Sequence, residues 1–216
     1  MSERIKIIVC AHKKCNMPKD PMYLPLHVGA AGKKNKDGSP LDFGYVRDDI
    51  GDNISDRNCN FGTQTGLYWV WKNLDADYKG LVHYRRYFVG RNYKKGDMLG
   101  SVITRDEIEP MLDKYKVFVP KKRRYYIESL YSHYAHTHDE THFQIVEKII
   151  SSDCPEYLDA FKKVMKRKWG YMFNMMILER NMMDDYCSWL FNILFQVVER
   201  IDKSNLSAFN SRFCGR

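Results

Sequence analysis

Two adjacent arginines, Arg85 and Arg86, follow a short apolar run in the segment GLVHYRRYF. Such a run is typical of a buried strand, and guanidinium groups at a strand end are costly unless an anion meets them. Arginine binds phosphate oxygens in pairs and stays charged at any working pH, so we expect at least one of the two to face a phosphate. The alternative is that one arginine pairs with acidic side chains at 48–52 and the other is solvated. His83 and Tyr84 precede the pair; a histidine there is most often a core residue.

A second candidate is the acidic segment DDIGDNIS, which holds Asp48, Asp49, Asp52 and Asn53. Its spacing differs from that of a calcium loop, because the glycine at position six and the closing glutamate are missing. Three interpretations stay open. The segment is a solvated acidic turn, a substrate loop whose carboxylates hold sugar hydroxyls or act as a base, or a metal site.

The Asp-x-Asp pair at Asp75 and Asp77 looks like the metal signature of many nucleotide-sugar glycosyltransferases. In those enzymes the aspartates close a strand and hold a divalent ion against the diphosphate. Here they come before the expected strand, at the opposite edge of the sheet. We therefore interpret this pair as a connecting turn, and note that the two arginines occupy the position of the metal-binding aspartates.

The segment HYAHTHDETH at 133–142 is rich in histidine and acidic residues. His138 and His142 are four residues apart and share a helix face, but the order is not HExxH and no third ligand is evident. We consider a solvated helix, a general base from Asp139 or Glu140, and a metal site.

Composition limits the function classes. The 216 residues carry 35 Lys and Arg against 27 Asp and Glu, a formal net charge of +8, which favours anionic partners such as phosphorylated ligands or a membrane surface. Nucleic acid is disfavoured, because no base-reading motif is present. Six cysteines without a CxxC pair, and no run long enough to span a bilayer, predict a cytoplasmic protein with reduced thiols and at most peripheral contact with the inner face of the plasma membrane.

The elements that must position these residues alternate between strands and helices. We expect strands within 4–12, 22–30, 80–83, 115–122 and 170–178, a long loop at 32–60, and helices at 60–74 (with Asn60 as N-cap), 127–166 and 182–201. This alternation predicts one α/β domain over 1–216 with a mostly parallel sheet flanked by helices. Ligands of such sheets bind at the carboxyl ends of the strands, which brings the end of the first strand, the acidic segment and the two arginines to one crevice.

The segments MPKDPMYLPLHVGA, DDIGDNISDRN, TGLYWVWKNLDADYKGLVHYRRYF and PEYLDAF together closely resemble a bacterial family of capsular and exopolysaccharide biosynthesis proteins. That family was long catalogued as a domain of unknown function and includes galactofuranosyltransferase domains. The resemblance covers nearly the whole chain. It implies a GT-A-like fold and inverting transfer of a sugar, with galactofuranose as the leading candidate, from a UDP-sugar to a lipid-linked glycan.

The resemblance also implies a set of site residues. The substrate-binding set comprises His12, Lys13, Asp48, Asp49, Asn53, His83 and Tyr84, with His12 and Lys13 near the uridine. An inverting transferase needs a carboxylate to deprotonate the acceptor and cations to help the departing diphosphate. We expect Asp52 or Asp139 as the base, Arg85 and Arg86 as leaving-group stabilisers, and neither a cofactor nor a required metal.

Two departures from the family pattern qualify this expectation. A glutamate commonly stands where this chain has Gln64, and members usually continue beyond a segment like SRFCGR into another helix, whereas this chain ends at Arg216. The alternative function is therefore a catalytically inactive module that binds a UDP-sugar or a glycan.

Overall fold

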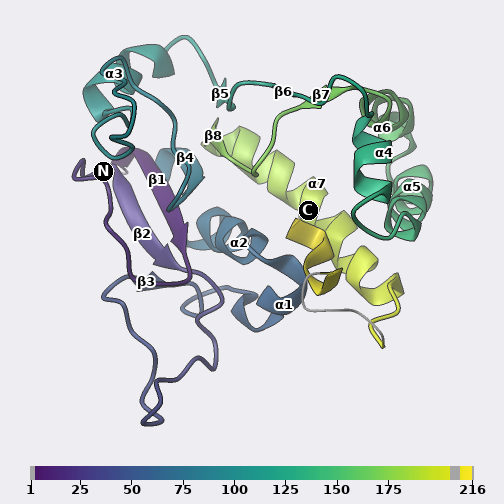
Figure 1. Cartoon of the computed structure of the whole chain (residues 1–216), viewed down its shortest axis with the longest axis horizontal. Coiled ribbons are helices and arrows are strands. Elements are labelled where there is room, and N and C mark those ends of the chain that lie inside the picture. The colour runs from purple at the N-terminus through teal and green to yellow at the C-terminus, as the bar shows by residue number, and fades with distance from the viewer. Residues whose placement is uncertain (1–2, 205–209, 216) are drawn as a thin grey trace.

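A six-stranded sheet forms the centre of the protein (Figure 1), which a computed structural model describes at residues 3–204 and 210–215. The strand order is β3-β2-β1-β4-β8-β5. The strands are β1 (Glu3–Ala11), β2 (Tyr23–His27), β3 (Val46–Arg47), β4 (Ala76–His83), β5 (Val117–Phe118) and β8 (Met176–Glu179). β3, β2, β1 and β4 run parallel, and β8 is antiparallel to β4 and β5. The expected α/β fold with a mostly parallel sheet is confirmed.

The central strand β1 is apolar because both of its faces are covered. Ile8 and Cys10 face one hydrophobic core, whereas Ile7 and Val9 face the other. A strand buried on two sides loses the alternation of apolar and polar residues and becomes a continuous hydrophobic run. This is the physical reason that its pattern was recognisable in the sequence.

Helices α2 (Gln64–Asn73) and α7 (Arg180–Arg200) cover one face of the sheet. They meet where the rings of Trp71 and Phe191 stack with centroids 5.8 Å apart. The expected single helix over 60–74 is wrong at its start. A short helix α1 (Asn58–Phe61) ends at Gly62, whose φ of 55° breaks the helix before α2 begins, so Asn60 lies inside α1 and is not an N-cap.

The other helices frame the two ends of the sheet. α3 (Arg105–Leu112) packs on the opposite face, and α4 (Leu130–Ala135), α5 (Thr141–Asp153) and α6 (Leu158–Met165) form a helical group in which α5 packs against α7. Shorter elements are η1 (Ser55–Arg57), η2 (Pro155–Tyr157) and η3 (Asn210–Gly215), with β6 (Arg123–Arg124) pairing with β7 (Trp169–Gly170). The strands expected over 115–122 and 170–178 are shorter than predicted, since only β5 and β8 join the main sheet.

Candidate functional site

A cavity of about 610 Å³ opens at the carboxyl ends of β1, β2 and β4. This is the edge at which parallel sheets bind ligands. Its wall comes from segments far apart in the chain: Cys10, His12, His27, Val28, Gly29, Lys33, Leu41, Asn58, Gly62, Thr63, His83, Tyr84, Arg85, Arg86, Phe173, Asn174, Arg212 and Gly215. The structure thus brings His12, His83, Tyr84, Arg85 and Arg86 together.

A tight turn after β4 presents the two arginines. The backbone N–H of Arg86 donates to the carbonyl of His83 (2.8 Å), and the N–H of Tyr84 donates to the carbonyl of Cys10 at the end of β1 (3.2 Å). Arg85 lies over the ring of Tyr84 (5.1 Å), and Arg86 lies over Phe173 (4.1 Å). Within residues 3–204 and 210–215 neither guanidinium has an ion pair with a carboxylate, so the alternative of pairing with the 48–52 aspartates is not observed.

The charged lining of this cavity is entirely cationic in the described part of the chain. Lys33 and Arg212 join the two arginines of the turn, and no Asp or Glu side chain is among the lining residues. Arg212 was missed by the sequence analysis, because it lies about 125 residues from the turn and in no recognisable motif. The sequence offered one signal for Arg212, namely that it lies in the SRFCGR segment, which the resembled family shares. A cluster of cations with no ion pair to a described carboxylate, around a cavity of this size, suits a phosphorylated ligand.

Three histidines also line the cavity. Burial lowers the pKa of His12, His27 and His83, and nearby cations lower it further. His83 Nε2 donates to the carbonyl of Phe173, which leaves Nδ1 as the acceptor in the neutral ring. The Nδ1 of His27 is buried without a hydrogen-bond partner among the described groups. Neutral imidazoles can accept a proton or a hydrogen bond from a ligand.

The part of the wall next to His83 and Arg86 has an unusual backbone. Phe173 (φ 75°) and Asn174 (φ 53°) are consecutive residues in the left-handed region, which costs about 1–3 kcal/mol for each non-glycine residue. His83 bonds the carbonyl of the first, and Asn174 Nδ2 donates to the carbonyl of Gly215 (3.3 Å). Strained backbone of this kind clusters at ligand sites. Here the backbone conformation places the Phe173 ring under the guanidinium of Arg86.

Asp48 is fully buried behind the segment that follows β2 and does not line the cavity. Its carboxylate accepts four hydrogen bonds, from the N–H of Gly29 (2.7 Å) and Ala30 (3.0 Å) and from the hydroxyls of Ser55 (2.5 Å) and Thr65 (2.7 Å). Its contacts therefore hold the chain after β2 in place. Through Gly29 they shape the floor of the cavity.

The other members of the acidic segment also lie outside the lining. Asp49 is held by Arg47 (Nε 3.0 Å, Nη2 2.6 Å), and this guanidinium lowers the pKa of the carboxyl group. Asp52 is exposed and accepts from the hydroxyl of Tyr68 (3.1 Å). Asn53 closes a local turn by donating to Gly51. Lys13, from the other predicted segment, lies 5.7 Å from the Tyr84 ring at the rim.

The Asp-x-Asp pair lies at the amino end of β4, as the sequence predicted. Asp75 precedes the strand, although Asp77 is within it. Both carboxylates contact Arg180, at 2.7 Å and 3.6 Å. Most of β4 separates them from the turn that carries the arginines, and their contacts join the start of β4 to the start of α7.

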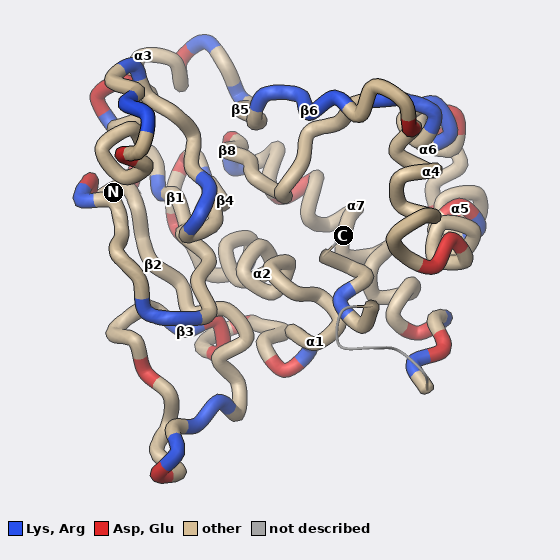
Figure 2. The backbone as a smooth tube through the Cα atoms, in the orientation of Figure 1, with Lys and Arg blue, Asp and Glu red and all other residues tan. Residues whose placement is uncertain are grey.

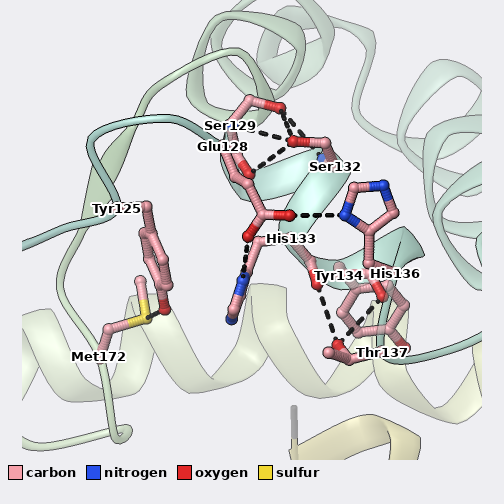
Figure 3. Close-up of polar contacts among 9 residues, drawn as sticks. All are labelled: Tyr125, Glu128, Ser129, Ser132, His133, Tyr134, His136, Thr137 and Met172. Atoms are coloured by element: carbon pink, nitrogen blue, oxygen red, sulfur yellow. Dashed lines mark hydrogen bonds and ion pairs between the residues drawn. The ribbon is translucent and has the colours of Figure 1, made fainter.

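The histidine-rich segment does not converge on one point. Glu128 accepts from His133 (2.8 Å) and His136 (2.5 Å), whereas buried His142 contacts the hydroxyl of Tyr134 (2.8 Å) (Figure 3 shows the Glu128 contacts). Asp139 accepts from the N–H of Thr141 at the start of α5 (2.9 Å) and does not line the cavity.

Neither a metal site nor a membrane-spanning helix is found among residues 3–204 and 210–215. No group of three or more His, Cys, Asp or Glu side chains is arranged to hold a metal ion. No helix has the length and apolar character needed to cross a membrane. The six cysteines, all within these residues, are free thiols.

Comparison with known proteins identifies the family. The model of a family described as a domain of unknown function (DUF4422) matches residues 6–216. The chain belongs to this family. No curated protein matches it. It is similar to the solved apo structure of the bifunctional glycosyltransferase WbbM, with a TM-score of 0.86 and 28% identity over 99% of this chain and 40% of that one. The DUF4422 chain thus spans less than half the length of WbbM.

Proposed function

We propose that this DUF4422 protein is a glycosyltransferase that moves a sugar from a UDP-sugar to a glycan acceptor. The observation that carries the proposal is the cavity at the carboxyl ends of β1, β2 and β4, with Lys33, Arg85, Arg86 and Arg212 around it and no acidic lining residue among those described. The 28% identity to WbbM over 99% of the chain supports the same reaction class.

The cations would bind the diphosphate of the donor. Guanidinium groups form paired hydrogen bonds with phosphate oxygens and stabilise the charge that develops as UDP departs. Arg86 is held over Phe173, so its position is set before the donor binds. In this proposal the arginines supply the charge that a divalent ion supplies in related folds, and the reaction needs no metal.

The donor sugar, with UDP-galactofuranose as the leading candidate, would be transferred with inversion to a lipid-linked glycan. Inversion needs a base near the acceptor hydroxyl. Asp52 and Asp139 lie outside the cavity lining, so either would need a bound acceptor or a loop movement to reach the reacting atoms. The geometry favours His12 or His83, whose lowered pKa values keep them neutral near pH 7.

The second candidate function is a module that binds a UDP-sugar without turnover. The absence of a carboxylate from the described lining favours it, as does Gln64, whose buried Oε1 has no hydrogen-bond partner in the described part of the chain. Binding of UDP is common to both candidates. Transfer or slow hydrolysis of a UDP-sugar separates them.

The experiment is a screen of UDP-sugars, in pyranose and furanose forms, with released UDP as the readout. We expect turnover with at least one donor, unchanged in EDTA, and abolished in Arg85→Ala/Arg86→Ala protein that retains the wild-type unfolding midpoint. Arg91→Ala, on an exposed loop outside the cavity, is the matched control. Loss of activity in EDTA with recovery in Mn²⁺ would refute the metal-free reaction, and near-normal turnover in the double variant would refute the role of the arginines.

A further inference from the structure

Two basic runs that are about 40 residues apart in the chain lie side by side in the structure. β6 and β7 pair in antiparallel register, and the N–H of Tyr125 donates to the carbonyl of Lys168 (2.8 Å). Figure 2 shows the resulting blue stretch between β5 and α6. We call this surface the basic band; it consists of Lys121, Lys122, Arg123, Arg124, Lys166, Arg167 and Lys168.

Aromatic rings contact Lys122, Arg123 and Arg167 of the basic band. Lys122 and Arg167 lie 4.0 Å and 4.7 Å from the centroid of the Trp169 ring, and Arg123 lies 5.1 Å from that of Tyr125. Within the described residues no ion pair joins the band to an acidic side chain. The first acidic residue after β6, Glu128, is already bonded by two histidines (Figure 3). The band therefore presents an uncompensated positive charge.

Two strongly exposed apolar side chains follow the band directly. Tyr126 is 79% exposed and Ile127 is 86% exposed, the latter the highest value among the large hydrophobic residues described. Tyr126 has a φ of 60°, a costly conformation for a tyrosine. The fold thus holds an isoleucine and a tyrosine outward beside a row of cations. This combination is typical of surfaces that lie in a membrane interface, where apolar side chains enter the acyl boundary and cations meet anionic headgroups.

The band also borders an apolar groove that leads to the candidate site. The groove has a volume of about 370 Å³, and Val117, Val119, Tyr171 and Met182 are among its lining residues. Lys122 lies 5.9 Å from the Tyr171 ring, which connects the groove to the band. Asn174 lines both the groove and the cationic cavity, which connects it to the site.

We propose that the basic band, together with Tyr126 and Ile127, is the surface by which this protein docks on an anionic lipid bilayer. A nucleic acid would account for the cations, but it would leave Ile127 against a polar backbone, whereas a bilayer accounts for both. The purpose of the surface rests on the proposed function: docking there brings a lipid-linked acceptor to the groove beside the donor cavity. Binding to vesicles needs no sugar nucleotide, so it is measured independently of transfer.

The test is co-sedimentation of the full chain with vesicles of phosphatidylcholine, with and without phosphatidylglycerol. We expect binding only to the anionic vesicles and a decrease with added salt. Each Lys or Arg near the surface strengthens binding by about fivefold, so Lys122→Gln/Lys168→Gln should weaken it about 25-fold. The matched control is Lys94→Gln/Lys95→Gln, two exposed lysines on the loop before α3, which should bind as the wild type does.

A second variant tests the apolar part. Ile127→Ser removes an exposed side chain without removing charge, and we expect about tenfold weaker binding with an unchanged unfolding midpoint. Three results would overturn the proposal: no binding of the wild type to anionic vesicles, an equal loss in the test and control lysine pairs, or binding to an RNA oligonucleotide that exceeds binding to the vesicles. If the protein binds vesicles but transfers no sugar, the proposed docking surface holds and only the proposed function is refuted.

Discussion

At the scale of single residues, the three aspartates of one short segment have three different environments. Asp48 is buried with four donors around it, Asp49 is paired with Arg47, and Asp52 is exposed beside Tyr68. The sequence placed all three near the site, because carboxylates after a strand of a parallel sheet commonly bind ligands. It could not distinguish their environments, since these depend on contacts with residues up to 21 positions away.

These environments predict different costs of substitution. Asp48→Ala leaves two backbone N–H groups and the Ser55 hydroxyl buried without an acceptor, and leaves the Thr65 hydroxyl with the Gly62 carbonyl alone. This should lower the free energy of unfolding by at least ~3 kcal/mol. Asp52→Ala removes one exposed hydrogen bond and should cost less than about 1 kcal/mol. Urea denaturation followed by circular dichroism measures both. Equal effects of the two substitutions would contradict the assigned role of Asp48.

At the scale of elements, helix α2 lies unusually close to the sheet. A Cβ atom at Gly66 would lie 2.7 Å from Cys10 Sγ and 2.9 Å from a methyl group of Val28. Both neighbours belong to the strand ends that form the cavity. Strand β1 was predictable because it ends in a continuous apolar run, whereas β4 was predicted only over its apolar second half, since Asp77 and Lys79 interrupt the first half. The break at Gly62 and the short β5 and β8 were not predictable, since they depend on tertiary contacts.

Gly66→Ala tests this close approach. Alanine favours a helix by about 1 kcal/mol over glycine, so an unpacked helix would become more stable. Here the added methyl group overfills the interface, and we expect a net loss of about 1–3 kcal/mol. Urea denaturation shows whether the substitution raises or lowers the free energy of unfolding. A stabilised Gly66→Ala protein would show that α2 and the sheet are not in close contact at this position.

At the scale of the whole molecule, the positive charge is divided between a cavity and the basic band. The net charge of +8 and the two basic runs were evident in the sequence, but their meeting through β6 and β7 was not. Likewise Arg85 and Arg86 could be placed at a strand end, whereas Arg212 joins them only through the packing of η3 against α1.

The histidines make the stability of the whole fold depend on pH. Burial lowers the pKa of four of them, His12, His27, His83 and His142, below the ordinary histidine value of about 6.5. The unfolded chain therefore binds more protons than the folded one just below pH 6.5, so stability falls as the pH falls through this value. Carboxyl groups whose pKa is lowered in the folded protein affect its stability only at pH values below this range. Urea midpoints measured from pH 8 down to about pH 5 should decrease; a constant or rising midpoint would contradict this account.

The most direct test of the central claim is the affinity of the cavity for UDP, measured by titration calorimetry in EDTA. Each arginine–phosphate contact contributes about 1.5–3 kcal/mol. We therefore predict that the wild type binds UDP and that Arg85→Gln/Arg86→Gln binds it at least ~100-fold more weakly, with uridine, which lacks phosphate, bound weakly by both. Equal affinity of the two proteins for UDP would show that the anion met by these arginines is not a nucleotide diphosphate.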